Sequence, residues 1–251
     1  DVERLVQAAR ELCDDQPRTF EEIRAILVKA GHAGDERAMG YAVRMQLPLV
    51  QVPSPGAAWG YDARAPFAVA DSWLGAPLNE DAEPQALVVR YLAAFGPASA
   101  ADAGVWSGLR GLREVFETLR PELLAFRDER GRELFDLPAA PRPPGDVEAP
   151  VRFLPDFDNL VLAHEDRTRL IAPEHRARIV SRNLQVAATF LVDGVVAGTW
   201  KVERKRKAAT LVLTPFAKVP KPAQRALEEE GLPLLAFLEP DALEHGVRVA
   251  A

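Results

Sequence analysis

One order of predicted elements occurs twice in this 251-residue chain, at an interval of about 80 residues. Apolar residues at helical spacing, strand-like runs and turn residues define these elements. The first copy is predicted to consist of three helices and two strands, at residues 2–12, 19–27, 35–43, 49–52 and 58–61. The second copy is predicted to consist of the same five elements, at residues 83–95, 99–107, 109–119, 123–126 and 133–137.

Three helices followed by a two-stranded wing form the winged-helix variant of the helix-turn-helix unit. Both copies carry local start signals for helices. Thr19 and Glu22 form a predicted capping box, and Pro84 stands in a first turn, where its missing N–H is not needed. Because chance rarely repeats an order of this many elements, the sequence predicts two winged-helix units, at residues 1–80 and 81–138.

A proline-rich stretch separates the second copy from the rest of the chain. Five of the thirteen residues at 138–150 are proline, which predicts a semi-rigid linker at 139–150. Beyond it, strands are predicted at 151–154, 187–192, 195–203 and 209–214, and helices at 221–231 and 241–244. The Asp193-Gly194 pair predicts a tight hairpin turn. The predicted fold class is α+β: tandem winged-helix units followed by a β-rich partial-barrel domain, at 151–251, with edge helices.

Charge is distributed unevenly along the chain, although the net charge is only −6. Residues 1–150 carry 16 Lys and Arg against 24 Asp and Glu, whereas residues 164–225 carry 13 against 5, a net charge of +8. Binding to a polyanion depends on the local field and not on the total charge. The acidic total therefore does not argue against nucleic-acid binding, although an acidic half that only keeps the protein soluble explains the same counts.

Residue type and spacing exclude several classes of site. Cys13 is the single cysteine, so an internal disulfide framework and a zinc site built from several thiolates are excluded. The four histidines are scattered, and the sequence contains no glycine-rich phosphate loop or nucleophile elbow. We therefore expect no metal and no cofactor.

The sequence also bears on where the protein works. No apolar run reaches the roughly 18 residues of a membrane span, and the first residues lack the pattern of a signal peptide. We expect a cytoplasmic protein with no membrane partner, associated with the nucleoid if it binds DNA. Because the sequence does not begin with Met, we also expect it to be part of a longer protein.

Basic side chains occur where winged-helix units and hairpins contact DNA. Four consecutive cations at 204–207 lie between two predicted strands, and such a run suits a polyanion. A turn that is merely solvated explains the same run, and that interpretation stays open. The predicted DNA-binding residues are Arg44, Arg110, Arg113, Arg127, Arg130, Arg132, Arg167, Arg169, Lys201, Arg204, Lys205, Arg206 and Lys207.

A second candidate is a polar site that lines a groove. Its residues are Asp156, Asp158 and His164. Two carboxylates at i and i+2 of an extended segment point the same way, near a histidine and two arginines. The alternative is structural: Asp156, Asp158 and Asp166 cap turns, or pair with Arg167 and Arg169.

Three runs of residues carry a resemblance to a known family. They are residues 47–53 with Trp59-Gly60, residues 154–158 with His164 and Asp166-Arg167, and residues 191–194 with Gly198-Thr199-Trp200. Over nearly the whole chain, the sequence resembles the bacterial winged-helix DNA-binding proteins that include the alkylpurine and interstrand-crosslink DNA glycosylases. The resemblance implies three tandem winged-helix units followed by a β-rich domain, DNA binding, and excision of alkylated bases.

The catalytic signature of that family is Gln-x-Gln or Gln-x-Asp in the first winged-helix unit. In this chain no two glutamines are separated by one residue. If the two predicted units correspond to the second and third units of the family, the catalytic unit either lies outside these residues or does not exist in this protein. We therefore assign no catalytic residue, although the stretch 156–169 can line the same groove.

The expected function is that of a DNA-binding protein resembling these glycosylases, and the expected partner is double-stranded DNA, damaged or intact. In this interpretation the chain is the portion that holds the duplex. One alternative is a non-enzymatic winged-helix transcription regulator, which requires sequence preference. The other is a protein-interaction scaffold, which the net charge of −8 over residues 1–150 supports.

Overall fold

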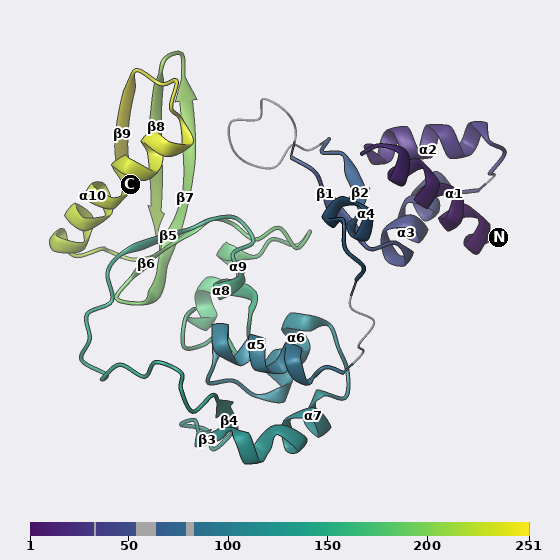
Figure 1. Cartoon of the computed structure of the whole chain (residues 1–251). Helices are drawn as coiled ribbons and strands as arrows, with labels where there is room; N and C mark the ends of the chain where they lie inside the picture. Colours follow the sequence, from purple (N-terminus) through teal and green to yellow (C-terminus); the bar gives the residue numbers. More distant parts are fainter. Residues whose placement is uncertain (33, 54–63, 79–82, 251) are drawn as a thin grey trace. The chain divides into compact units, whose positions relative to one another are not determined.

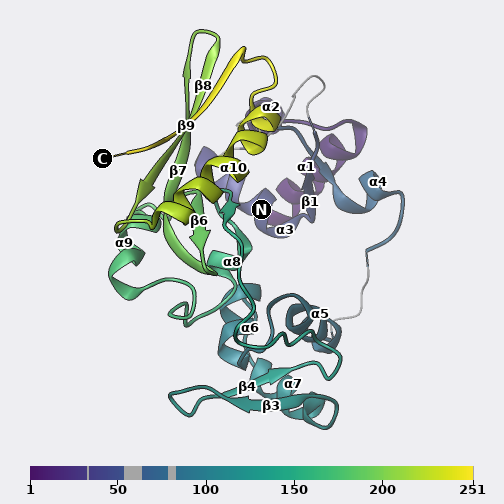
Figure 2. The same ribbon diagram turned by 90° about the vertical axis from the view of Figure 1, so that its left-hand side faces the viewer.

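The computed structural model describes residues 1–32, 34–53, 64–78 and 83–250. The fold is of the mixed α+β class, and the chain divides into two compact units, Asp1–Ala82 and Glu83–Ala251. Figures 1 and 2 show the elements of each unit from two directions. None of the helices in the described part of the chain combines the length and hydropathy that a membrane-spanning helix needs.

Three helices open the first unit, and each begins at a residue whose side chain caps it. These helices are α1 (Val2–Asp15), α2 (Phe20–Lys29) and α3 (Glu36–Gln46). Asp1, Thr19 and Asp35 each accept a hydrogen bond from a first-turn N–H, and Thr19 forms the predicted capping box with Glu22. Apolar residues at helical spacing then pack into one core, which includes Leu5, Ala9, Ile23, Leu27, Met39 and Val43.

A short sheet follows these helices. β1 (Leu49–Gln51) pairs antiparallel with β2 (Phe67–Val69), so that Leu49 lies opposite Val69. α4 (Ala70–Leu74) continues directly from β2. The strand predicted at residues 58–61 lies outside the described residues.

The second unit begins with the same order of elements. Its helices are α5 (Gln85–Phe95), α6 (Ala100–Ser107) and α7 (Leu112–Leu119). A 3-10 turn, η1 (Arg120–Glu122), leads into β3 (Leu124–Arg127) and β4 (Glu133–Asp136), which pair antiparallel. The core between these elements includes Val88, Tyr91, Leu92, Phe116 and Phe135. This order of three helices and a hairpin is the one predicted for residues 81–138.

Two glycines form the turn between α6 and α7. Gly108 ends α6 with φ 75° and Gly111 precedes α7 with φ 76°. Other residues adopt such left-handed conformations only at a cost, so glycine permits this tight connection. The turn places Arg110 and Arg113 at the start of α7.

The proline-rich stretch contains no helix or strand between β4 and β5, and Arg142 donates hydrogen bonds to the carbonyl oxygens of Leu137 and Pro138. A five-stranded sheet follows, in the order β5-β6-β7-β8-β9. Its strands are β5 (Arg152–Leu154), β6 (Thr189–Val192), β7 (Val195–Lys205), β8 (Ala208–Pro215) and β9 (Glu244–Val249). All neighbours pair antiparallel except β8 and β9, which pair parallel.

The predicted Asp193-Gly194 turn connects β6 and β7. Both residues have positive φ, 52° and 73°, and Val192 lies opposite Val195. Such a two-residue turn matches the twist of a hairpin. The sequence signal therefore identified this connection.

One long helix, α10 (Lys221–Leu238), packs on this sheet, and two predictions made there are wrong. The helix does not end at Gly231, because that residue faces the sheet: an added Cβ would lie 2.8 Å from Leu211 and 3.2 Å from Val247. The glycine thus permits close packing, and it places α10 on a face of the sheet instead of at its edge. The short helix predicted at 241–244 is also wrong, since β9 begins at Glu244.

The long segment between β5 and β6 forms a smaller core. It contains α8 (Asn159–Leu162), the 3-10 turn η2 (Pro173–His175) and α9 (Arg176–Ile179). Buried side chains from this segment, including Val161, Ile171 and Ile179, pack against Leu191 of β6 and Val196 of β7. This core anchors the loop at 163–170, which carries several of the predicted functional residues.

Candidate nucleic-acid interface

The polar group at Asp156, Asp158 and His164 is built differently from the prediction. Phe157 has φ 58°, so the segment is not extended and the two carboxylates do not point the same way. Asp156 accepts a hydrogen bond from the Ala188 N–H at 2.8 Å, and Asp158 caps α8 by accepting from the Leu160 N–H at 2.8 Å. Both carboxylates therefore satisfy backbone amides, as the structural alternative proposed.

His164 is buried, with 8% of its surface exposed. Its Nε2–H donates to the carbonyl oxygen of Phe95 at 3.0 Å, and its ring lies near those of Phe95 and Tyr91. Burial, followed by the charge of Arg169, lowers the pKa of His164, so the imidazole is neutral at neutral pH. The side chain connects the loop to α5.

Asp102 organises the loop that follows His164. This carboxylate is 1% exposed and belongs to a capping box in which Ser99 donates to it from both its N–H, at 2.8 Å, and its hydroxyl, at 2.7 Å. Its other oxygen accepts from the Glu165 N–H at 2.9 Å. Burial by itself raises the pKa of Asp102, but the hydrogen bonds from Ser99 and Glu165 outweigh it, so the pKa is lowered. An ionised, buried carboxylate thus ties the start of α6 to the loop.

A rigid turn connects β3 and β4 and carries three arginines. Asp128 accepts hydrogen bonds from the backbone N–H groups of Arg130 and Arg132, at 2.9 and 2.8 Å, and from Arg132 Nε at 2.6 Å. Arg127 Nη1 donates to the carbonyl oxygen of Gly131 at 3.2 Å. These bonds fix the turn and hold its guanidinium groups.

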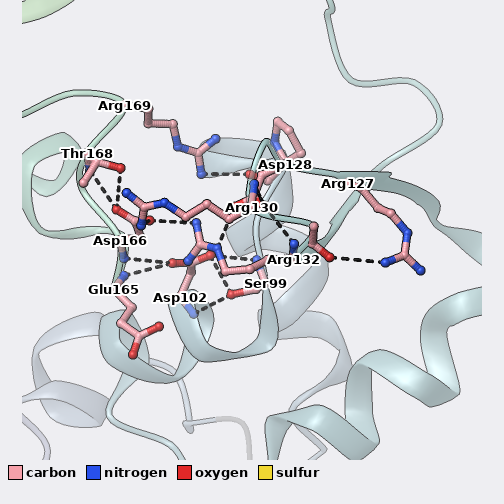
Figure 3. Close-up of polar contacts among 12 residues, drawn as sticks. Ser99, Asp102, Arg127, Asp128, Arg130, Arg132, Glu165, Asp166, Thr168 and Arg169 are labelled. Atoms are coloured by element: carbon pink, nitrogen blue, oxygen red, sulfur yellow. Dashed lines mark hydrogen bonds and ion pairs between the residues drawn. The ribbon is translucent and has the colours of Figure 1, made fainter.

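Asp166 joins the loop to this turn, as Figure 3 shows. One of its oxygens lies 2.9 Å from both Arg130 Nη1 and Arg132 Nη2. The other oxygen accepts from the N–H and the hydroxyl of Thr168, at 2.9 and 2.7 Å. The Thr168 hydrogen bonds, and then the two arginines, lower the pKa of Asp166. Asp166 thus caps a turn, as the structural alternative allowed, but its ion pairs are with Arg130 and Arg132 and not with Arg167 or Arg169.

Those two arginines bond to backbone instead. Arg167 Nε donates to the carbonyl oxygen of His164 at 3.0 Å, and burial lowers its pKa. Arg169 Nη2 donates to the carbonyl oxygen of Pro97 at 3.0 Å. Arg169 lines a depression of about 560 Å³ together with the arginines of the β3–β4 turn and Thr168, whereas Arg167 does not line it.

The second basic region is the turn between β7 and β8. Lys205 lies opposite Ala208, so Arg206 and Lys207 form a two-residue turn, with Arg206 at φ 56°. The side chains of Lys205, Arg206 and Lys207 are exposed and make no ion pair within the described residues. We call these three residues the basic turn.

Two residues predicted to belong to this region are neutralised by partners. Arg204 lies in β7, where its Nε donates to Glu239 at 2.6 Å. Lys201 pairs with Glu203 at 2.8 Å on the same strand. The run of four cations therefore divides into one paired arginine and three exposed, unpaired cations.

The remaining predicted residues lie on the third helix of each unit or just before it. Arg110 in the turn before α7 and Arg113 in its first turn are exposed, and both border a depression between α6, α7 and β4. In the first unit, the guanidinium of Arg44 lies 3.9 Å from the centre of the Phe20 ring, so this arginine packs on an aromatic face. Within the described residues, no group of three or more His, Cys, Asp or Glu side chains is arranged so that it could bind a metal ion.

Sequence reasoning did not find the connecting roles of Asp102, Asp128 and Asp166. Asp102 and Asp166 have partners on other elements, up to 64 residues away in the case of Asp102. Asp128 bonds within its own turn, and Asp166 with Thr168 two residues later also favours a turn, so both carry a local signal. No local signal indicates which arginines such a carboxylate pairs with.

The chain is 28% identical over 167 residues to an interstrand DNA cross-link repair glycosylase from Streptomyces sahachiroi, a match that covers 63% of this chain and 43% of that relative. The chain thus spans less than half the length of this curated relative.

The structure is similar to that of the DNA glycosylase AlkZ from Streptomyces sahachiroi, with a TM-score of 0.69 and 24% sequence identity over 99% of this chain and 69% of that one. This likeness shows the fold. A family model for AlkZ-like DNA glycosylases matches residues 1–237, which is most of the sequence. The chain therefore belongs to the AlkZ-like DNA glycosylase family.

Proposed function

We propose that this chain holds double-stranded DNA for a glycosylase-like repair reaction. The observation that carries the proposal is the basic turn, whose three exposed cations have no acidic partner in the described residues. Unpaired cations at the tip of a hairpin gain most from contact with phosphates, because they release counterions without first breaking an ion pair. Family membership supports DNA as the polyanion.

The proposal extends to the two sets of three helices and a hairpin, which we interpret as winged-helix units. In such units the third helix lies in or near the major groove and the wing contacts the backbone. Exposed arginines near α7 and the β3–β4 turn support this interpretation: Arg110 just before α7, Arg113 in its first turn, Arg127 at the end of β3 and Arg130 in the turn. These contacts position a duplex without reading its sequence.

The substrate is proposed to be duplex DNA with an alkylated or cross-linked base, after the name of the Streptomyces sahachiroi relative. A glycosylase must extrude its target base and stabilise the sugar as the base leaves. The described carboxylates at 102, 156, 158 and 166 are all used by backbone amides or arginines. We therefore propose that the chain holds the duplex through its basic residues and that the chemistry needs groups other than these carboxylates. A cytoplasmic location at the nucleoid follows from this function.

Fluorescence anisotropy with a labelled random duplex tests the proposal. The 251-residue chain should bind at low salt, and the affinity should fall steeply as salt rises. The triple variant Lys205→Ala, Arg206→Ala, Lys207→Ala should bind more weakly on all sequences. Each lost phosphate contact removes about 0.9 from the slope of log K against log salt, so three lost contacts flatten it by about 2.7.

A charge-matched control distinguishes the basic turn from total charge. The variant Lys218→Ala, Lys221→Ala, Arg225→Ala removes the same charge near the start of α10. It should retain most of the affinity and of the salt slope. Equal losses in the two triple variants would show that only net charge matters, and absence of duplex binding by the unmodified chain would refute the proposed function.

A further inference from the structure

The strongest unassigned feature is the cluster of guanidinium groups around Asp166. One carboxylate oxygen of Asp166 holds Arg130 and Arg132 at the same distance, 2.9 Å, although both come from a different element. Asp166 is itself fixed, because Thr168 donates two hydrogen bonds to its other oxygen and the adjacent Glu165 N–H is held by the buried Asp102. Figure 3 shows this chain of contacts from α6 to the hairpin turn.

These arginines keep most of their donors available. A guanidinium has five N–H groups. Arg130 uses one on Asp166, Arg169 uses one on Pro97, and Arg127 uses one on Gly131. Arg130 is also 64% exposed. The depression of about 560 Å³ that they line therefore presents several aimed N–H donors to the outside.

The guanidinium groups that line this depression are suited to bind a tetrahedral oxyanion such as phosphate. Planar guanidinium groups bind phosphate oxygens through paired, charge-assisted hydrogen bonds. Fixing a flexible arginine before binding removes part of the entropy cost of the contact. An arginine that bonds to a single carboxylate oxygen keeps its other N–H groups available. Asp166 can therefore orient the guanidinium groups of Arg130 and Arg132 without using all of their donors.

We propose that this depression binds one backbone phosphate of the DNA duplex and that Asp166 is a positioning residue for Arg130 and Arg132. The inference rests on the proposed duplex-holding function and adds a specific site to it. Asp166 does not touch the phosphate. It acts by holding two arginines on the hairpin turn in one orientation relative to Arg169 on the loop.

The substitution Asp166→Asn tests the proposal, because an electrostatic effect and a positioning effect change the affinity for DNA in opposite directions. Asparagine keeps an oxygen for the Thr168 hydrogen bonds but places an NH₂ group against the arginines, so the tether is lost while the loop turn remains. Removing a negative charge near DNA strengthens binding if only the field matters. Loss of positioning weakens binding instead. The proposal expects the Kd for random duplex to rise about tenfold, because two arginines must be ordered on binding.

Glu129→Gln is the matched control. Glu129 lines the same depression and carries the same charge, and its side chain makes no ion pair within the described residues. Its substitution should leave the Kd unchanged or lower it slightly. In an Arg130→Ala, Arg132→Ala background, Asp166→Asn should have no further effect, because the residues it positions are gone.

Anisotropy titrations at one salt concentration measure the Kd of each variant for random duplex and so test the proposal. Circular dichroism melting curves verify that each variant is folded. Weaker binding by Asp166→Asn together with unchanged binding by Glu129→Gln supports the site. Tighter binding by both variants, or an undiminished effect of Asp166→Asn in the double-alanine background, overturns the positioning role and leaves the duplex-holding function in place. Failure of the unmodified chain to bind duplex overturns the proposed function and this inference with it.

Discussion

Gly198 in β7 permits the sheet that carries the basic turn to close over its core. A Cβ added there would lie 2.5 Å from two ring carbons of Phe190 and 2.6 Å from the carbonyl oxygen of Thr214. Carbon atoms in contact need about 3.5 Å, so the ring would have to move by about 1 Å. Phe190 is fully buried, and its space is bounded by Phe153 and the α10 helix.

Gly198→Ala should therefore lower the free energy of unfolding of the Glu83–Ala251 unit. Overpacking of a core costs about 1–3 kcal/mol, and replacing glycine by alanine returns about 0.5–1 kcal/mol through the unfolded chain. The added Cβ would also contact the backbone oxygen of Thr214, which cannot rotate away, so we expect an overpacking cost near the upper end of this range. We expect a net loss of about 2 kcal/mol, which lowers the melting temperature by about 4–8 °C for a unit of this size.

Gly246→Ala is the matched control on β9. Its φ is not left-handed and no atom lies within 4 Å of the added Cβ, so alanine should be neutral or stabilising. Urea unfolding followed by tryptophan fluorescence measures both variants, and hydrogen exchange of peptides from 189–215 locates the loss in the sheet. Equal stability changes for the two variants would refute the contact argument.

Two further predictions concern buried polar groups. Asp102→Asn should cost about 1–3 kcal/mol at pH 7, since it leaves Ser99 donors unsatisfied. Because the pKa of Asp102 is lowered on folding, its stabilisation is present above the unfolded value near 3.9 and is lost as the pH falls, so urea midpoints of the two proteins should converge below about pH 4. Tyr91→Phe removes the 2.8 Å hydrogen bond to the Ala163 carbonyl and should cost about 1 kcal/mol by the same assay, while an equal midpoint would contradict the bond's role.

Local signals in the sequence predicted most helix starts and one hairpin correctly. Thr19 with Glu22 and Asp193-Gly194 each determine backbone geometry within a few residues, so no tertiary information is needed. Gly231 was misread for the opposite reason. Glycine both ends helices and permits close packing, and only the sheet beneath α10 decides between these roles.

Pairings between distant residues account for the other errors. A helix was predicted at 241–244 and β9 was missed, because the residues of β9 form a strand only by pairing parallel with β8. At the candidate interface, Asp166 pairs with Arg130 and Arg132, and Arg204 pairs with Glu239. The sequence supplied the basic residues themselves, but not which of them are neutralised, because a carboxylate selects its partner through the fold.

The position of β9 has a consequence for the order of folding. β6, β7 and β8 are joined by two tight turns and can pair as soon as they are synthesised, whereas β9 pairs with β8 only after α10 has been added. The Leu243 N–H also donates to the Lys207 carbonyl at 2.7 Å. The basic turn can thus form early in synthesis as the tip of the β7–β8 hairpin, whereas the backbone contact that holds it from the segment before β9 forms last.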